Sequence, residues 1–293
     1  MQADATENGR PGDRMVGRRV AVVGLGAMGR PIARHLAVAG LRPLLVDLDQ
    51  SLVRAGADAG GVPADLAAAA AADVVLLTVA SDADVRAIGL DGGLAAAMSD
   101  GGVLCICSSV LPETCRDIAA AAPTVHVLDT ALTGGVRGAE SGAVNLLVGG
   151  DEAGLERARW ALDPWTATVH HLGPLGAGQV AKTVNNLLHW AQISAISEAL
   201  ELGRRHGLSI PDLRRALLDS PVASRTLREL EQMRLTWHAK DLANALVMAE
   251  QVGLDTPVAR MSQAVMQSVT VPSLHDLLTS GPDYGKVANR ANG

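Results

Sequence analysis

The first half of the chain alternates short apolar runs with stretches of helical periodicity. The apolar runs are rich in Val, Leu and Ile and almost uninterrupted, which is typical of strands buried on both faces of a parallel sheet. Helical stretches separate them, so we predict an α/β fold with a doubly wound parallel sheet. The predicted strands are residues 18–24, 43–47, 73–79, 103–107 and 125–129, while 145–150 and 168–172 could extend the sheet, with antiparallel pairing as one option.

The strand pattern stops after residue 173, and helical patterns follow one another to the end of the chain. This change indicates a second, all-helical domain that a long helix joins to the first. The predicted helices are residues 28–39 in the first half and 176–206, 210–219, 222–234, 239–252 and 256–270 in the second.

A glycine-rich turn links the first predicted strand to the first predicted helix. Its glycines have the spacing Gly-x-Gly-x-x-Gly in the order strand, turn, helix. The first would allow the tight turn, the second the close approach of a pyrophosphate, and the third close packing of helix on strand. A purely structural turn is the alternative. The motif predicts a Rossmann-type dinucleotide site whose loop is Gly24, Leu25, Gly26, Ala27, Met28 and Gly29.

The acid that ends the second predicted strand bears on the choice of cofactor. Asp47 lies 18 residues beyond Gly29, where a carboxylate would accept hydrogen bonds from the adenosine ribose hydroxyls. Such a carboxylate would repel a 2′-phosphate, so we favour NAD over NADP. Asp49 is a rival for this role, and Arg42 and Arg54 keep NADP possible.

These patterns predict three segments. Residues 1–17 are expected to be a disordered leader, because they are polar and contain acids, which argues against a signal or transit peptide. Residues 18–174 are predicted to form the Rossmann NAD(P)-binding domain. Residues 175–293 are predicted to form an all-helical domain for substrate binding or oligomerisation.

Composition narrows the possible partners and the cellular setting. A net charge of −6 without a Lys/Arg-rich run argues against nucleic acid. The chain has no apolar run of about 18 residues, so we expect no membrane span. Cys105, Cys107 and Cys115 form no ligand cluster and are expected to be reduced thiols, which fits a cytoplasmic protein. His170 and His171 show no ligand spacing either, and we predict no metal.

A narrow polar stripe crosses the long predicted helix. Lys182, Asn185, Asn186 and His189 fall within about one third of its circumference. Burial lowers the pKa of a lysine, so it can exchange a proton near neutral pH, which an arginine cannot do. Lys182 is therefore a candidate general acid/base, with a snorkelling or chance lysine as the alternative. His189 is more consistent with a packed, hydrogen-bonded residue than with a second acid/base.

A second glycine-rich segment follows the strand predicted at 125–129. Thr133, Gly134 and Gly135 could hold a carboxylate or a carbonyl oxygen through a hydroxyl group and backbone N–H groups. A glycine-rich hairpin without a binding role fits the same residues equally well.

Four motifs, in this order, resemble the β-hydroxyacid dehydrogenase family. That family includes 3-hydroxyisobutyrate dehydrogenase and tartronate semialdehyde reductase and is related to 6-phosphogluconate dehydrogenase. The resemblance covers about residues 18 to 285. The motifs are the nucleotide turn GLGAMGRPIARHL, the substrate turn DTALTGGVRGAESGAVNLLVGG, the catalytic helix GPLGAGQVAKTVNN and the segment KDLANAL at 240–246.

The resemblance implies roles for individual residues. Lys182 would be the general acid/base, assisted by Asn186, which would also touch the substrate. Thr133, Gly134 and Gly135 would bind the substrate's acid group. The remaining matches are Val79 and Ala80 at the cofactor, Ser109 beside the nicotinamide, Lys240 closing over cofactor and substrate, its neighbour Asp241, and Met233 where the family often has an aromatic residue.

Some positions depart from the family pattern. Thr133 replaces the usual Ser, Ala80 and Ala131 replace prolines, and His189 replaces an apolar residue. These positions surround the substrate, so they bear on its identity rather than on the type of reaction.

By resemblance, the chain transfers a hydride between NAD(P) and the alcohol or carbonyl carbon of a small 3-hydroxy acid or semialdehyde. An imine reductase is one alternative, although those enzymes usually have Asp or Tyr in place of Lys182. A non-catalytic dinucleotide-binding protein is another, although known relatives of that kind have lost the lysine. The helical domain is too short for a 6-phosphogluconate enzyme. The expected partners are a hydroxy acid or aldehyde substrate and further copies of this chain, in a homodimer or homotetramer.

Overall fold

The computed structural model describes residues 17–283, so the leader predicted for residues 1–17 lies outside the described residues except for Gly17. Contacts divide the chain into two compact units, one ending at Lys182 and the other beginning at Thr183. The division falls inside a single long helix, eight residues beyond the boundary predicted at 174/175. The units are described separately below.

The first unit contains a single eight-stranded sheet in the order β3-β2-β1-β4-β5-β6-β7-β8. All neighbouring strands are parallel except β6 and β7, which pair antiparallel, and this confirms the predicted doubly wound sheet. The two-residue strand β3 was not predicted. The strands are β1 Val20–Val23, β2 Leu44–Val46, β3 Val62–Pro63, β4 Val74–Leu77, β5 Val103–Ile106, β6 His126–Thr133, β7 Val144–Gly149 and β8 Thr166–His171.

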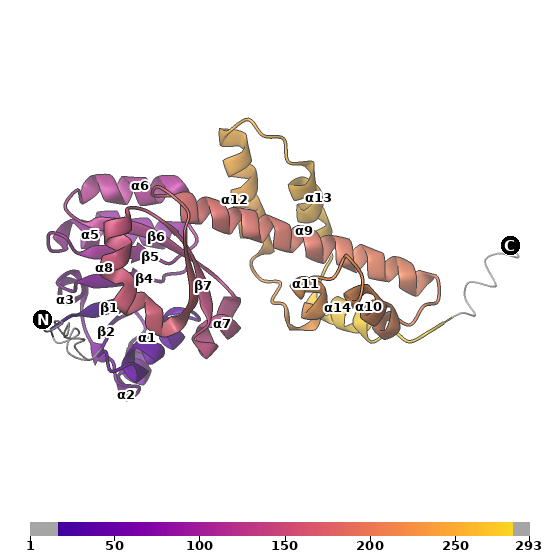
Figure 1. The fold of residues 1–293 in the computed structure, drawn as a ribbon, viewed down its shortest axis with the longest axis horizontal. Coiled ribbons are helices and arrows are strands. Elements are labelled where there is room, and N and C mark those ends of the chain that lie inside the picture. The colour runs from indigo at the N-terminus through magenta and orange to yellow at the C-terminus, as the bar shows by residue number, and fades with distance from the viewer. Residues whose placement is uncertain (1–16, 284–293) are drawn as a thin grey trace, which may run out of the picture. The chain divides into compact units, whose positions relative to one another are not determined.

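Side chains of the central strands alternate between two apolar cores, one on each face of the sheet. Val20 and Val22 belong to one core, whereas Ala21 and Val23 belong to the other. Helices α1, α2, α7 and α8 cover the first face, and α3 to α6 cover the second (Figure 1). These helices are α1 Gly29–Val38, α2 Gln50–Asp58, α3 Leu66–Ala70, α4 Asp82–Arg86, α5 Leu94–Ala97, α6 Pro112–Ala121, α7 Gly135–Ser141 and α8 Glu152–Leu162, with short helical turns at Ala87–Asp91 and Asp163–Trp165.

The strand order reverses between β1 and β4. The chain proceeds from β1 to β2 on one side, returns, and continues from β4 to β5 on the other side. Ligands of open α/β sheets bind outside the carboxyl ends of the strands at such a reversal point. The segments that follow β1 and β4 are therefore the part of the sheet most suited to a nucleotide.

The second unit is entirely helical in the described part of the chain. Its core gathers Leu, Ile, Met and Trp side chains from several helices around Trp190 and Ile193 of α9. No described helix combines the length and apolarity needed to cross a lipid bilayer. The helices are α9 Ala177–Arg205, which begins in the first unit, α10 Ile210–Leu218, α11 Arg225–Arg228, α12 His238–Gln251, α13 Pro257–Met266 and α14 Val271–Leu278, with a 3₁₀ turn at Leu230–Gln232.

The helix predicted at 222–234 was wrong. Ser224 caps a helix that begins only at Arg225, and α11 ends after one turn. The Arg214 side chain donates hydrogen bonds to the carbonyl oxygens of Leu227 and Arg228 at 2.9 and 2.7 Å. It therefore occupies carbonyl groups that a longer helix would use for its own hydrogen bonds.

The helix predicted at 256–270 was also too long. α13 ends at Met266, and Thr270 begins a separate helix, α14, through a reciprocal capping box with Ser273. Pro272 lies in the first turn of α14, where its missing N–H group costs nothing. The sequence TVPS carried this start signal, which the apolar pattern concealed.

Candidate functional site

The glycine-rich loop has the conformation that its sequence predicts. Gly24 has a φ of +93°, and a β-carbon there would lie 2.8 Å from the Thr78 carbonyl oxygen. A β-carbon on Gly29 would overlap the Gly24 carbonyl oxygen. At Gly26, by contrast, an added β-carbon would meet nothing within 4 Å. The turn is thus closed toward the protein and open in front of the α1 N-terminus, which fits a bound pyrophosphate.

Asp47 holds this loop from the end of β2. Its carboxylate accepts hydrogen bonds from the N–H groups of Leu25 at 2.6 Å and Asp49 at 2.8 Å. Asp49 instead caps α2, since its carboxylate accepts hydrogen bonds from the N–H and hydroxyl groups of Ser51. Of the two rival acids, Asp47 is therefore the one bonded to the glycine-rich loop.

Thr78, which sequence reasoning missed, closes the loop from the neighbouring strand. Its hydroxyl group donates a hydrogen bond to the Gly24 carbonyl oxygen at 2.5 Å, and its N–H group bonds to the Val23 carbonyl oxygen at 2.8 Å. A threonine after an apolar strand is common, so its position alone carried no signal. The contact depends on β1 and β4 being neighbours in the sheet.

The segments after β4 and β5 are tied together. The Ser108 hydroxyl group donates a hydrogen bond to the Val79 carbonyl oxygen at 2.7 Å. Ser108 is buried, whereas Ser109 is partly exposed and Ala80 is exposed. The predicted cofactor residues Val79, Ala80 and Ser109 thus lie at the same edge of the sheet as the glycine-rich loop and Asp47.

The predicted substrate turn connects two antiparallel strands through a short helix, not through a tight hairpin. Thr133 ends β6, and its hydroxyl group lies 3.3 Å from the Asn145 carbonyl oxygen of β7. Gly134 and Gly135 both have positive φ, at +105° and +63°, and both are exposed. The hydroxyl proton is already used, so the Thr133 oxygen can only accept a further hydrogen bond unless that bond is released.

The start of α9 is held by two residues that the sequence did not single out. Asp129, in the middle of β6, is fully buried and accepts hydrogen bonds from the N–H groups of Gly176 and Gln179, both at 2.7 Å. The Gln179 side chain is 1% exposed and bonds to the backbone of Ser108 and Val110. Lys182 follows three residues later, half-buried, and belongs to the first unit.

The other predicted residues lie in the second unit. Asn186 is 8% exposed and accepts a hydrogen bond from the Asn185 amide at 3.1 Å. Asp241 accepts a hydrogen bond from the indole N–H of buried Trp190 at 3.0 Å. Met233 packs against the core of this unit, and Lys240 is half-buried in the first turn of α12.

His189 occupies a packed position in the second unit. Its ring lies 4.9 Å from the Trp190 ring, and its Nδ1 atom lies 3.4 Å from the Thr226 hydroxyl oxygen. This environment agrees with the structural interpretation of His189.

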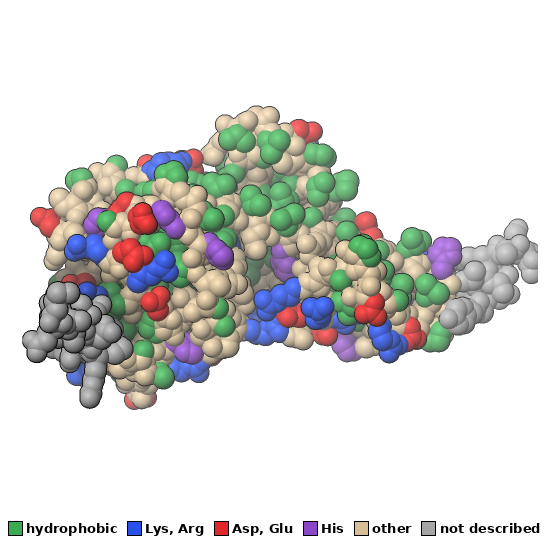
Figure 2. Space-filling model, viewed as in Figure 1, with side chains coloured by type: hydrophobic (Ala, Val, Ile, Leu, Met, Phe, Trp, Pro, Cys, Tyr) green, Lys and Arg blue, Asp and Glu red, His purple; other side chains and the backbone are tan. Residues whose placement is uncertain are grey.

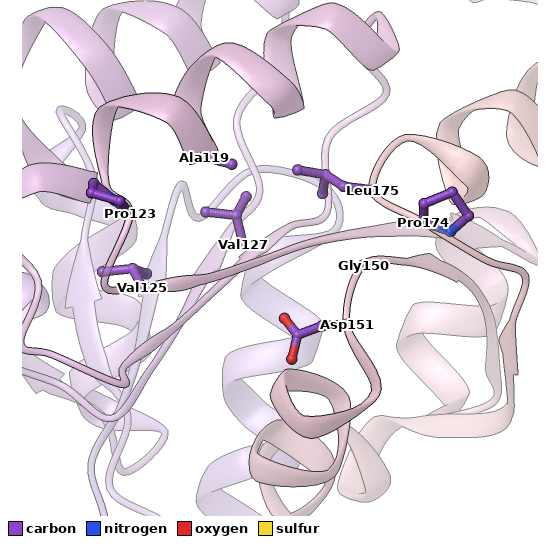
Figure 3. A pocket seen from close by; sticks show the side chains of 8 residues that line it. All are labelled: Ala119, Pro123, Val125, Val127, Gly150, Asp151, Pro174 and Leu175. Atoms are coloured by element: carbon purple, nitrogen blue, oxygen red, sulfur yellow. The ribbon is translucent and has the colours of Figure 1, made fainter.

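A shallow hollow of about 430 Å³ in the first unit is lined by none of the predicted catalytic, substrate-binding or cofactor-binding residues (Figure 3). Apolar side chains surround it, and Asp151 is its charged lining group. Asp151 is already bonded to the His126 ring and to the Gly154 N–H group. Within residues 17–283, no three His, Cys, Asp or Glu side chains are grouped as metal ligands.

Two protein-family models match most of the described chain. Residues 19–173 match the model of the NAD binding domain of 6-phosphogluconate dehydrogenase. Residues 176–277 match a model described as the NAD-binding domain of NADP-dependent 3-hydroxyisobutyrate dehydrogenase.

Two relatives come from Pseudomonas aeruginosa. One is a 3-hydroxyisobutyrate dehydrogenase, 38% identical over 194 residues, which are 64% of this chain and 65% of the relative. The other is an NAD-dependent L-serine dehydrogenase, 38% identical over 198 residues, which are 65% of this chain and 66% of the relative. The chain thus aligns with about two thirds of the length of each.

A solved structure of similar fold is the Mycobacterium tuberculosis 3-hydroxyisobutyrate dehydrogenase with L-serine. It is 26% identical, has a TM-score of 0.78, and the match covers 94% of this chain and 99% of that one.

Proposed function

Because this chain belongs to the β-hydroxyacid dehydrogenase family, we propose that it oxidises a small 3-hydroxy acid, or reduces the corresponding semialdehyde, with Lys182 as general acid/base. One observation carries the proposal. The contacts place Lys182 in the same compact unit as the glycine-rich loop, Asp47 and the substrate turn. A proton acceptor and the nucleotide-binding residues therefore belong to one body.

The glycine-rich loop and Asp47 would hold NAD(P), which would supply the hydride acceptor in oxidation and the hydride donor in reduction. In oxidation, Lys182 as a neutral amine takes the proton of the substrate hydroxyl group. In reduction, its ammonium form donates a proton to the developing alkoxide.

The neighbouring residues bind and orient the substrate. Asn186 lies one helical turn beyond Lys182 on the same face of α9, so its amide can bond to the same reacting oxygen. The exposed backbone of Gly134 and Gly135 can donate hydrogen bonds to the substrate carboxylate, while Thr133 ends the strand that presents them. By family resemblance, Lys240, Asp241 and Met233 of the second unit are also proposed to bind substrate or cofactor.

NAD is the preferred cofactor in this proposal. Asp47 is bonded to the loop at Leu25, and its carboxylate ends the strand beside β1. A ribose can donate its hydroxyl hydrogens to this carboxylate, whereas a 2′-phosphate would bring like charge beside it.

The test of the function is a spectrophotometric screen of 3-hydroxy acids, L-serine and semialdehydes with NAD and with NADP. Lys182→Ala and Lys182→Arg should each lower kcat on the best substrate by roughly 100-fold or more, since general acid–base catalysis typically contributes that much. NAD binding, followed by tryptophan fluorescence, should persist in both variants. Gln192→Ala, an exposed change on the same helix, is the matched control.

Near-normal turnover of Lys182→Ala would contradict this mechanism. Tight NAD binding by the wild-type protein without hydride transfer to any compound would favour a non-catalytic dinucleotide-binding protein.

We also infer a homodimer or homotetramer in a cytoplasmic setting. Hydrophobic side chains gather over the α12–α13 hairpin, where Val252 and Met261 are 75% and 65% exposed (Figure 2). Light scattering on the purified protein tests the first inference, and a monomeric mass would contradict it. The second is supported by the three cysteines of the chain, which are free and buried.

A further inference from the structure

The carboxylate of Asp129 is buried at the start of the helix that carries Lys182. It is 0% exposed and accepts hydrogen bonds from the Gly176 and Gln179 N–H groups, both at 2.7 Å. Burial raises the pKa of Asp129, while these backbone hydrogen bonds act in the opposite direction. A buried carboxylate is costly, and it is tolerated here because the first N–H groups of α9 need an acceptor.

Two glycines make this contact possible. A β-carbon on Gly149 would overlap an Asp129 carboxylate oxygen, and one on Gly178 would overlap the Leu147 carbonyl oxygen. The same β-carbon on Gly178 would lie 2.8 Å from the other Asp129 oxygen. The backbone of α9 therefore approaches β6 and β7 as closely as glycine allows.

The Gln179 side chain makes a second connection, to the segment after β5. Its amide nitrogen donates a hydrogen bond to the Ser108 carbonyl oxygen at 2.8 Å, and its amide oxygen accepts one from the Val110 N–H group at 3.1 Å. These two backbone groups flank Ser109, the residue expected beside the nicotinamide. Ser108 is in turn bonded through its hydroxyl group to the Val79 carbonyl oxygen. Hydrogen bonds thus run without a gap from the end of β4, through the end of β5, to α9 and β6.

β6 relates the same helix to the substrate turn. Asp129 and Thr133 are four residues apart in one strand, so their side chains point to the same face, about 13 Å apart at 3.3 Å per residue. On α9, Gln179 precedes Lys182 by three residues, which is about 4.5 Å along the axis and about 60° around it. Any tilt or rotation of the first turn of α9 therefore moves Lys182 relative to both Ser109 and Thr133.

We propose that Asp129 and Gln179 are positioning residues that fix the position of Lys182 relative to the segment 108–110 after β5 and to the substrate turn. This inference rests on the proposed function of Lys182. Displacing an acid/base group by about 1 Å can lower turnover by roughly 100-fold without loss of binding.

The first test is kinetic. Gln179→Met keeps the length of the side chain and removes both of its hydrogen bonds, and Gln192→Met makes the same change at an exposed position of the same helix. Gln179→Met is expected to lower kcat by about 10- to 100-fold, with NAD affinity changed by less than about threefold. Gln192→Met should match the wild type in both.

Gln179→Glu gives a pH readout that a merely structural role would not produce. A protonated carboxylic acid has one donor and one acceptor, like the amide, whereas an ionised one has no donor for the Ser108 carbonyl oxygen. The kcat of Gln179→Glu relative to wild type should therefore rise as the pH falls. A constant ratio across the pH range would count against the proposal.

The second test does not depend on turnover. The chain has only three lysines, Lys182, Lys240 and Lys286, so trace acetylation with acetic anhydride and mass spectrometry can follow each separately. The labelling rate of an amine depends on its position and on the groups around it, so Gln179→Met and Asp129→Asn should change the labelling rate of Lys182 by at least about threefold. The labelling of Lys240 and Lys286 should stay as in the wild type.

The outcomes separate this proposal from the proposed function. If the Lys182 labelling profiles of both variants superimpose on the wild-type profile, the positioning role is overturned. If the profiles change but the wild-type protein transfers hydride to no compound, the positioning role stands and the proposed reaction fails.

Discussion

A methyl group added at two glycines of the same loop should change two different properties of this protein. In Gly26→Ala the new methyl group meets no protein atom within 4 Å, and the backbone at Gly26 is not in the left-handed region. In Gly29→Ala the methyl group overlaps the Gly24 carbonyl oxygen and lies 2.5 Å from the Thr78 hydroxyl oxygen. The first change is expected to alter cofactor binding and the second to alter the fold.

The magnitudes follow from these distances. Forcing a methyl group into packed backbone costs about 1–3 kcal/mol or more, and each kcal/mol lowers the Tm of a domain of this size by roughly 2–4 °C. Gly29→Ala should therefore lower Tm by about 2–12 °C. Gly26→Ala should leave stability within about 0.5 kcal/mol of wild type, since such open surface changes are nearly neutral.

Cofactor affinity should show the reverse sensitivity. The methyl group of Gly26→Ala would occupy the open space in front of the α1 N-terminus, where the pyrophosphate is expected to bind through backbone N–H groups. Losing such hydrogen bonds to a charged group costs about 1.5–3 kcal/mol each, so NAD should bind at least about tenfold more weakly.

The assay is differential scanning fluorimetry of each variant with and without NAD, together with titration of NAD by tryptophan fluorescence. A Gly26→Ala protein that folds normally and binds NAD like the wild type would refute the assignment of the loop. A Gly29→Ala protein with unchanged Tm would refute the packing argument.

Three further changes test separate parts of the structure. Asp47→Asn should raise the ratio of kcat/KM with NADP to kcat/KM with NAD by about fivefold or more, because one like-charge contact costs roughly 1–4 kcal/mol. Asp49→Asn should leave this ratio unchanged. If Asp49→Asn raised the ratio and Asp47→Asn did not, Asp49 would be the residue that selects the cofactor. Thr78→Val removes the hydroxyl group bonded to the glycine-rich loop and should lower the free energy of unfolding in urea by about 1 kcal/mol. Thr78→Ser keeps a hydroxyl group and should lower it by less, and equal losses in the two variants would show that the hydrogen bond does not stabilise the protein. Glu201 has a pKa lowered from 4.5 to about 2, chiefly by the hydrogen bond from Arg204. The stabilisation from this ion pair is complete above about pH 4.5 and is lost as the pH falls toward 2. Glu201→Gln should therefore be less stable than the wild type at pH 7 and equally stable near pH 2, and a stability difference that persists at pH 2 would contradict this.

Local patterns were sufficient to predict most of the fold. β1, β4 and β5 are buried on both faces, and their nearly continuous apolar sequences are the pattern that predicts such burial. The glycine-rich loop was predictable because its glycine spacing and its position between a strand and a helix are local features of the sequence, and Gly24 and Gly29 are each in close contact with the loop or with the segment after β4.

The residues that sequence reasoning missed make contacts with distant parts of the chain. Asp129 bonds to groups 47 and 50 residues away, and Gln179 to groups 69 and 71 residues away. Thr78 meets the Gly24 carbonyl oxygen across 54 residues. No periodicity or spacing signals such contacts, since they exist only once the strand order brings the segments together. Arg214 ended a predicted helix early in the same way, by bonding to carbonyl groups 13 and 14 residues away.

The division of α9 after Lys182 has a consequence for how enzymes of this design can diversify. Both apolar cores of the sheet consist of residues that precede Lys182, so the unit that contains Lys182 has an interior of its own. The helices that follow have a separate core around Trp190 and Ile193. A recombination event or a designed chimera joined within α9 just beyond Lys182 would replace the whole second unit. The recipient would keep the glycine-rich loop, Asp47, the substrate turn and Lys182 in one unit and would acquire a different helical second half.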